Sequence, residues 1–204
     1  MKQHLMGGLW FAIVAAAALA QTNPGVAPDV LIRQTAEEIL VLAAADKRVD
    51  KGDTGELIKL VEVKVAPHFD FDTMTRLAVG RHWREASAQQ RQALAAEFRK
   101  LLLRTYTGAY AANRGVKTRV KPLRPGDSAE EVTVNSELIL PNNAPPVSVD
   151  YDLRATANGW KIYNVTVEGV SLVTTYRSEF NEQIRKTGVD GLIRRLQERN
   201  RPAS

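Results

Sequence analysis

The chain has 204 residues, no cysteine and a formal net charge of +5 at pH 7. This length is enough for one sizeable core, or for one domain with a small appendage. The absence of cysteine excludes disulfide bonds and thiol chemistry, so that stability has to come from the core alone.

The first twenty residues have the pattern of a secretory signal peptide. After a short polar start, residues 5–20 are almost wholly apolar, and Ala18-Leu19-Ala20 matches the small-x-small pattern that signal peptidase cleaves. We therefore expect residues 1–20 to be removed and residues 21–204 to form an exported protein. An uncleaved N-terminal anchor is the alternative.

Basic residues gather in two places, along residues 117–124 and from Arg194 to Arg201. For an exported protein, an anionic lipid surface is a more natural partner for them than nucleic acid. Ordinary solvated faces explain the same residues.

Residues 28–112 have the apolar spacing of several helices. Asp29 is a good N-cap for the first helix, whose apolar stripe fades near Val49. A second helix is expected to begin after Thr54 and to stop at Pro67, because the residue before a proline disfavours the helical conformation.

Two further helices are predicted from their caps. Asp70 or Asp72 begins a short helix that Gly80 ends. Ser87 with Gln90 predicts a capping box for the longest helix, which extends for about six turns.

Past residue 115 the apolar period changes from helical spacing to alternation. This pattern predicts an antiparallel meander of four strands, with turns at Pro125-Gly126-Asp127 and Ala157-Asn158-Gly159, over about residues 116–168. In the last strand the alternation shifts by one residue at Tyr163-Asn164, which predicts a β-bulge.

Two helices are expected over about residues 170–199, separated by Gly188, with the Ser171 hydroxyl as N-cap of the first. Helices, then strands, then helices indicate the α+β class. We expect a curved four-stranded antiparallel sheet, rolled into a cone-like form and covered by several helices. The pattern fits both a solid core and an enclosed apolar pocket.

The sequence offers little for catalysis or metal binding. His68, Asp70 and Asp72 alternate, with His82 as a possible fourth ligand, but helix capping explains both aspartates without a metal. There is no G-x-S-x-G motif, Walker loop or G-x-G-x-x-G motif. We therefore expect no catalytic residue, no metal and no cofactor.

Two segments carry motifs of a known family. Residues 65–110 contain P-x-F-D-F followed by L-x-x-G-x-x-W, and residues 159–196 contain W-K-x-Y-x-V-x-x-E-G-V-S-L-V-x-x-Y-R-x-x-F. On these motifs the chain resembles the MlaC family of periplasmic phospholipid-binding proteins, which are also called toluene-tolerance or organic-solvent-tolerance proteins. One departure is Asn164, where the family often has Asp.

The resemblance implies a carrier that shuttles glycerophospholipids across the periplasm and maintains outer-membrane lipid asymmetry. Its partners would be an outer-membrane lipoprotein–porin complex and an inner-membrane ABC transporter with a substrate-binding ring. Family members bury the acyl chains of the cargo in an interior cavity and leave the head group near solvent. Two acyl chains need a cavity at or beyond the usual upper limit of roughly 1,000 Å³.

No family motif identifies the residues that line the cavity, so strand phase and helix stripe are used to predict them. The predicted lipid-binding residues are Leu101, Val132, Val134, Leu138, Val149, Tyr151, Ile162, Val165, Val173 and Tyr176. Two alternatives for the function are a lipid-free periplasmic adaptor of a membrane transport complex and an exported hydrolase without a recognised motif.

Overall fold

The computed structural model describes residues 25–45, 55–112, 115–123, 130–141 and 144–201. The expected signal peptide and the Thr54 cap lie outside these residues. Within the described part of the chain, no helix is both long enough and apolar enough to cross a membrane.

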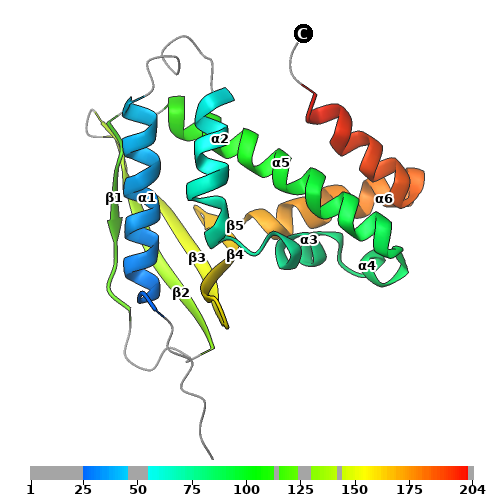
Figure 1. The fold of residues 1–204 in the computed structure, drawn as a ribbon, viewed down its shortest axis with the longest axis horizontal. Coiled ribbons are helices and arrows are strands. Elements are labelled where there is room, and N and C mark those ends of the chain that lie inside the picture. The colour runs from blue at the N-terminus through cyan, green and yellow to red at the C-terminus, as the bar shows by residue number, and fades with distance from the viewer. Residues whose placement is uncertain (1–24, 46–54, 113–114, 124–129, 142–143, 202–204) are drawn as a thin grey trace, which may run out of the picture.

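The described residues form seven helices and five strands in an α+β arrangement (Figure 1). In chain order these are α1 (Pro28–Ala45), α2 (Gly55–Lys64), η2 (Ala66–His68), α3 (Phe71–Val79), α4 (His82–Glu85), α5 (Ala88–Ala112), β1 (Lys117–Val120), β2 (Glu131–Ile139), β3 (Val147–Thr156), β4 (Gly159–Val167), β5 (Val170–Ser171) and α6 (Leu172–Arg199).

The strands form one antiparallel sheet in the order β1-β2-β3-β4-β5. The expectation of four strands was therefore wrong by one. The fifth strand forms because Glu168 and Gly169, both with positive φ, reverse the chain so that Val170 pairs with Val167. A strand of two residues is too short to show an alternating pattern in the sequence.

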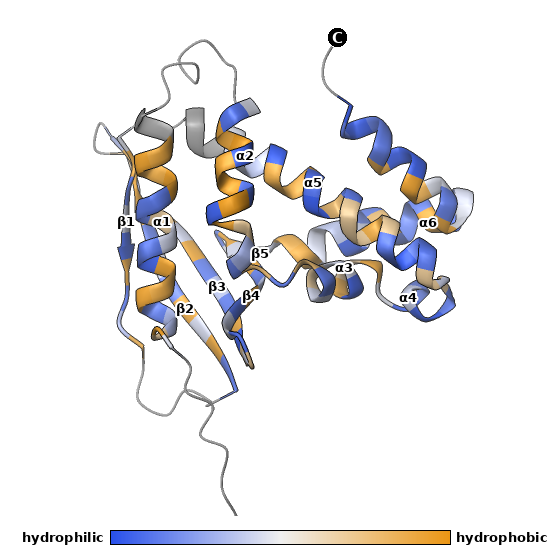
Figure 2. Ribbon diagram, viewed as in Figure 1, coloured by the Kyte–Doolittle hydropathy of each residue, from blue (hydrophilic) through white to orange (hydrophobic). Residues whose placement is uncertain are grey.

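The predicted bulge is confirmed in β4. Leu153 pairs with Ile162 and the preceding Asp152 pairs with Asn164, so that Tyr163 is the extra residue on the bulged strand. A bulge of this kind bends its strand and increases the local twist. Figure 2 shows the banding of apolar and polar residues along β2 and β3 that the alternating sequence predicts.

Side-chain caps begin three of the helices as expected. Gln90 N–H donates to Ser87 Oγ at 3.1 Å and Ser87 N–H donates to Gln90 Oε1 at 2.9 Å, which completes the capping box of α5. Thr73 N–H donates to Asp70 Oδ1 at 2.9 Å, and Thr174 N–H to the Ser171 hydroxyl at 3.2 Å. Asp29, by contrast, lies within the first turn of α1 rather than before it.

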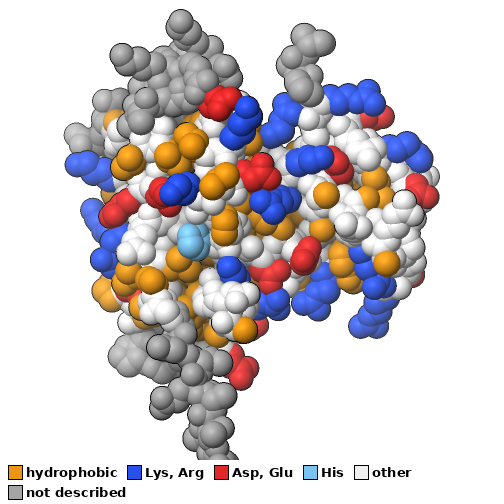
Figure 3. Space-filling view, viewed as in Figure 1, with side chains coloured by type: hydrophobic (Ala, Val, Ile, Leu, Met, Phe, Trp, Pro, Cys, Tyr) orange, Lys and Arg blue, Asp and Glu red, His pale blue; other side chains and the backbone are white. Residues whose placement is uncertain are grey.

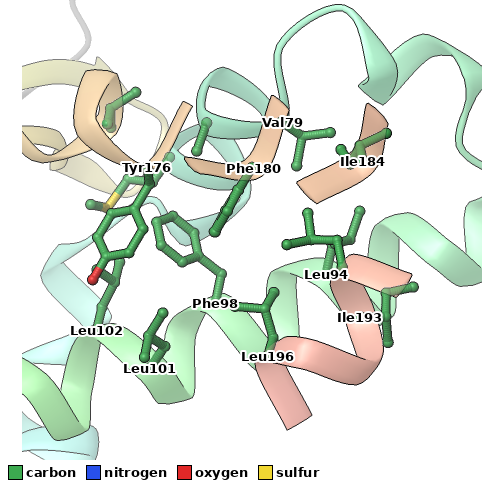
Figure 4. Packing of buried hydrophobic residues seen from close by; sticks show 14 residues of the cluster. Val79, Leu94, Phe98, Leu101, Leu102, Tyr176, Phe180, Ile184, Ile193 and Leu196 are labelled. Carbon is green, nitrogen blue, oxygen red and sulfur yellow. The ribbon is translucent and has the colours of Figure 1, made fainter. Parts of the chain in front are cut away.

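The helices α3, α5 and α6 enclose a solid hydrophobic core (Figure 4). The Phe98 ring meets Tyr176 at a centroid distance of 4.9 Å and Phe180 at 5.1 Å, both edge to face. The kink at Gly188 returns the second half of α6 to this core, where Ile193 and Leu196 lie against α5. The sheet forms the other side of the molecule, with α1 lying across it (Figure 1).

Candidate functional site

An apolar cavity of about 430 Å³ lies between the sheet and the helices α1, α2 and α5. Its lining residues are Ile32, Thr35, Ala36, Ile39, Val61, Val65, Phe69, Phe71, Met74, Leu102, Leu103, Tyr106, Thr107, Val116, Leu138, Leu140, Val147, Val149, Tyr151, Ile162, Val165, Val167 and Leu172. No charged side chain is among these described residues, so that the cavity suits an apolar ligand.

The bulge in β4 contributes directly to this wall. Ile162 and Val165 are three residues apart, and in a regular strand they would point to opposite faces. Because Tyr163 is an extra residue, Ile162 pairs with Leu153 and Val165 with Tyr151, both of which face inward. Both β4 side chains therefore line the cavity.

The cavity borders only part of the inner face of the sheet. Under α1, Leu31 packs with Val132, Leu153 and Trp160 in a closed cluster, and none of these four residues lines the cavity. Close packing of this kind leaves few voids larger than a water molecule. The cavity is consequently less than half as large as the roughly 1,000 Å³ expected for two acyl chains.

The Tyr106 phenol in the wall is neutral at physiological pH. Burial, followed by its interaction and hydrogen bond with the Tyr176 hydroxyl, raises the pKa of the Tyr106 phenol far above its ordinary value. Thr35 Oγ1 is buried and has no hydrogen-bond partner among the described residues. The described part of the cavity wall therefore offers hydroxyl groups but no ionised group to a ligand.

The sequence profile of the family described as MlaC protein matches residues 33–198. The chain belongs to the MlaC family.

Solved and curated proteins agree with this family. The structure resembles a phospholipid-binding protein from Ralstonia solanacearum, solved in complex with a phospholipid, with a TM-score of 0.78 and 34% identity. That match covers 86% of this chain and 97% of the other. The intermembrane phospholipid transport system binding protein MlaC of Haemophilus influenzae is 22% identical over 188 residues, which cover 91% of this chain and 86% of that protein. The toluene tolerance protein ttg2D of Pseudomonas putida is 23% identical over 164 residues, which cover 80% and 75%.

The ten predicted lipid-binding residues of this MlaC-family chain divide into two groups. Leu138, Val149, Tyr151, Ile162 and Val165 line the cavity. Their contact with lipid remains a prediction.

The other five predicted residues lie in closed parts of the protein. Val132 and Val134 belong to the cluster under α1. Leu101, Val173 and Tyr176 belong to the helical core. The helix stripe pointed to Leu101, but the adjacent Leu102 is the one on the cavity wall, because neighbouring residues of a helix point about 100° apart.

The predicted lipid-binding residues include helical ones but none from α1 or from the P-x-F-D-F motif. Ile32, Ala36 and Ile39 of α1 follow an apolar stripe at helical spacing, which could have indicated an inward face. The aromatic residues of P-x-F-D-F, Phe69 and Phe71, also line the cavity. A motif reveals that these residues matter to the family but not which space they border.

Among the described residues, the surroundings of His68 and His82 do not form a metal site. His82 is buried, with Nδ1 3.0 Å from Glu85 Oε2 and Nε2 3.0 Å from Asn181 Oδ1. Burial, and then the positive charge of Lys161, lowers the pKa of His68. Among the described residues, no three His, Cys, Asp or Glu side chains are placed to hold a metal ion. That the protein needs no metal remains a prediction.

Proposed function

We propose that the protein carries glycerophospholipids across the periplasm between an outer-membrane lipoprotein–porin complex and an inner-membrane ABC transporter with a substrate-binding ring. The observation that supports this function best is the cavity without charged lining residues, in a fold whose Ralstonia solanacearum counterpart was solved with a phospholipid. In this proposal residues 1–20 are removed on export, and the phospholipid is cargo rather than a cofactor.

The energetics of acyl chains explain why such a carrier is needed. Each methylene that is moved out of water contributes about 0.8 kcal/mol, so that a chain of about 15 methylenes costs roughly 12 kcal/mol to expose. The apolar cavity lowers this cost during the crossing. The inner faces of β3 and β4 and the apolar stripe of α1 supply the surface that replaces the membrane interior.

The chemical composition of the cavity wall favours a carrier over an enzyme. The described lining residues include the hydroxyl groups of threonine and tyrosine but no carboxylate, imidazole or amine. Hydrolysis of an ester needs a nucleophile with a base to activate it. We infer that bound phospholipid leaves the protein unchanged.

The test uses two neighbouring residues on opposite faces of β3. Val149 is buried and lines the cavity, whereas the Ser148 side chain is exposed. Val149→Arg places a charge among the acyl chains, which costs several kcal/mol unless the charge escapes to water. We expect co-purified phospholipid, measured by denaturing mass spectrometry, to fall about tenfold or more in this variant.

Ser148→Arg is the control, because it adds the same side chain on the outer face. It should keep the full lipid load and the melting temperature of the wild type. A folded Val149→Arg protein with a full lipid load would contradict the carrier proposal. Wild-type protein that is free of phospholipid when it is isolated, and that cannot be loaded, would favour the lipid-free adaptor.

A further inference from the structure

A second hollow lies on the outer side of the cavity wall. This outer groove, of about 890 Å³, is bordered by the C-terminal turn of α2, by η2, by the start of α3, by α5 and by the turn between β3 and β4. Its lining includes four basic side chains, those of Arg91, Arg99, Lys100 and Lys161, and three acidic ones, those of Glu62, Asp70 and Asp72. On the face shown in Figure 3, basic and acidic side chains are mixed over α2 and α5.

The outer groove and the apolar cavity share two residues, Phe69 and Phe71. Their rings are stacked, with centroids 5.6 Å apart and an angle of 20° between the planes. The pair therefore separates an apolar space on one side from a charged one on the other.

The guanidinium group of Arg99 lies on the outer side of the Phe69–Phe71 pair. Arg99 lies over the Phe71 ring at 5.3 Å, and one of its terminal nitrogens is 3.4 Å from a Glu62 carboxylate oxygen. Arg99 Nε is buried and has no hydrogen-bond partner among the described residues. An unpaired donor of this kind is uncommon in folded proteins.

Two other cations of the outer groove have no acidic partner among the described residues. Arg91 Nε donates to the main-chain carbonyl of Trp83 at 2.9 Å, and its guanidinium lies over the Trp83 ring at 5.6 Å. Lys161 Nζ donates to the main-chain carbonyl of Pro67 at 2.6 Å. Their charges are thus left for an anion, and an arginine is well suited to bind phosphate oxygens.

We propose that the outer groove binds the phosphate of the phospholipid whose acyl chains lie in the apolar cavity, with Arg91, Arg99 and Lys161 as the binding residues. This inference rests on the proposed carrier function. The lipid then passes between the rings of Phe69 and Phe71, which move apart on loading. The arrangement also gives a whole diacyl phospholipid more space than the cavity of about 430 Å³ offers by itself.

The position of the head group can be tested with one tryptophan as a reporter. Trp83 lines the outer groove, Trp160 lies in the closed cluster under α1, and the third tryptophan, Trp10, belongs to the expected signal peptide. In a Trp160→Phe protein, delipidated and reloaded, phosphatidylcholine with a nitroxide on its head group should quench Trp83 more strongly than phosphatidylcholine with a nitroxide at the chain end. Stronger quenching by the chain-end label would overturn the proposal.

The chemistry of the site can be tested by comparing phosphatidylglycerol with a diacylglycerol that has the same chains but no phosphate. The wild type should bind phosphatidylglycerol more tightly. In the double variant Arg91→Gln/Lys161→Gln the affinity for phosphatidylglycerol should fall about tenfold, which is the usual effect of losing charge-assisted hydrogen bonds. Its affinity for diacylglycerol should not change. Arg99 is left in place, because its loss would leave Glu62 unpaired.

Lys59→Gln/Lys64→Gln is the matched control, since it removes two lysines of α2 whose partners are Glu56 and Glu38. This variant should keep the preference for phosphatidylglycerol. Equal affinity of the wild type for the two lipids, or an unchanged preference in Arg91→Gln/Lys161→Gln, would overturn the phosphate site but not the carrier function. Binding of neither lipid by the wild type would overturn both. Inorganic phosphate that competes as well as phosphatidylglycerol would show a site for free anions instead.

Discussion

At the scale of single residues, Asp70 shows how one side chain orders a whole segment. Its carboxylate accepts a hydrogen bond from Thr73 N–H and pairs with Arg154, while its own N–H donates to the Ile162 carbonyl at 2.8 Å. These contacts join the start of α3 to β3 and β4. They also set the two phenylalanines on either side of Asp70 against the cavity. An aspartate at this position of P-x-F-D-F therefore has a structural role that requires no metal.

Glu97 is a residue whose charge should stabilise the fold in a pH-dependent way. Its carboxylate accepts hydrogen bonds from Asn200 Nδ2 at 2.8 Å and from Lys100 Nζ at 2.9 Å, which joins α5 to the end of α6. Burial raises the pKa of Glu97, but the hydrogen bonds from Asn200 and Lys100 outweigh this effect, and the pKa lies below its ordinary value of 4.5.

We therefore expect Glu97→Gln to lower the free energy of unfolding at neutral pH. Because the pKa is lower in the folded state, the stabilisation is present above about pH 4.5 and is lost as the pH falls through the folded-state pKa. Urea unfolding of both proteins at about pH 7 and about pH 3.5 measures the change. Glu182→Gln, at a fully exposed pair with Lys186, is the control and should have little effect. A difference between wild type and Glu97→Gln that stays the same at both pH values would refute the prediction.

At the scale of elements, the interruption of α6 at Gly188 determines where the second half of this helix packs. Gly188 has φ 72° and ψ 180°, a conformation that is essentially restricted to glycine. The two halves of the helix would otherwise continue in one direction. The interruption returns Leu192, Ile193 and Leu196 to the core formed by α3 and α5.

Two glycine-to-alanine substitutions separate the effect of backbone conformation from that of space. A Cβ atom would have no neighbour within 4 Å at either Gly188 or Gly108. Gly188→Ala should destabilise the protein by about 1–3 kcal/mol, because alanine is strained at this φ and ψ. Gly108→Ala, in the helical interior of α5, should stabilise it by about 0.5–1 kcal/mol. Thermal unfolding measures both, and equal effects of the two substitutions would show that the conformation of Gly188 does not matter.

At the scale of the whole molecule, the two sides of the protein use their apolar residues differently. The helical side packs them into a solid core around Phe98 and Phe180, whereas the sheet side leaves a cavity between β3, β4 and the helices. Side chains that border a cavity lose the contacts that a packed neighbour would supply. A ligand that fills the cavity restores these contacts.

Removal of the lipid should therefore lower the melting temperature of the wild type. Ligand binding to the folded state alone stabilises a protein by about 2.7 kcal/mol when the free ligand is at a hundred times its Kd. Melting curves of delipidated protein, and of the same protein reloaded with phosphatidylglycerol, measure the shift. Val149→Arg should show no shift on reloading. The absence of a shift in the wild type would mean that the lipid is not bound to the folded state.

Features that depend on neighbours in the chain could be predicted from the sequence. The sequence predicts the capping box at Ser87 and Gln90, a cap at Asp70 or Asp72, a β-bulge at Tyr163-Asn164 and a break at Gly188, because each depends on residues at most a few positions apart. The family could also be recognised, because its motifs consist of residues at fixed spacings in the sequence.

Features that depend on contacts between distant segments required the tertiary structure. Val134 and Val149 both face inward on neighbouring strands, yet only Val149 lines the cavity. Strand alternation tells which face a residue is on, but not what lies opposite that face. Whether an apolar surface becomes core or cavity is decided by the volume of side chains that arrive from elsewhere in the chain, and no local pattern encodes that volume.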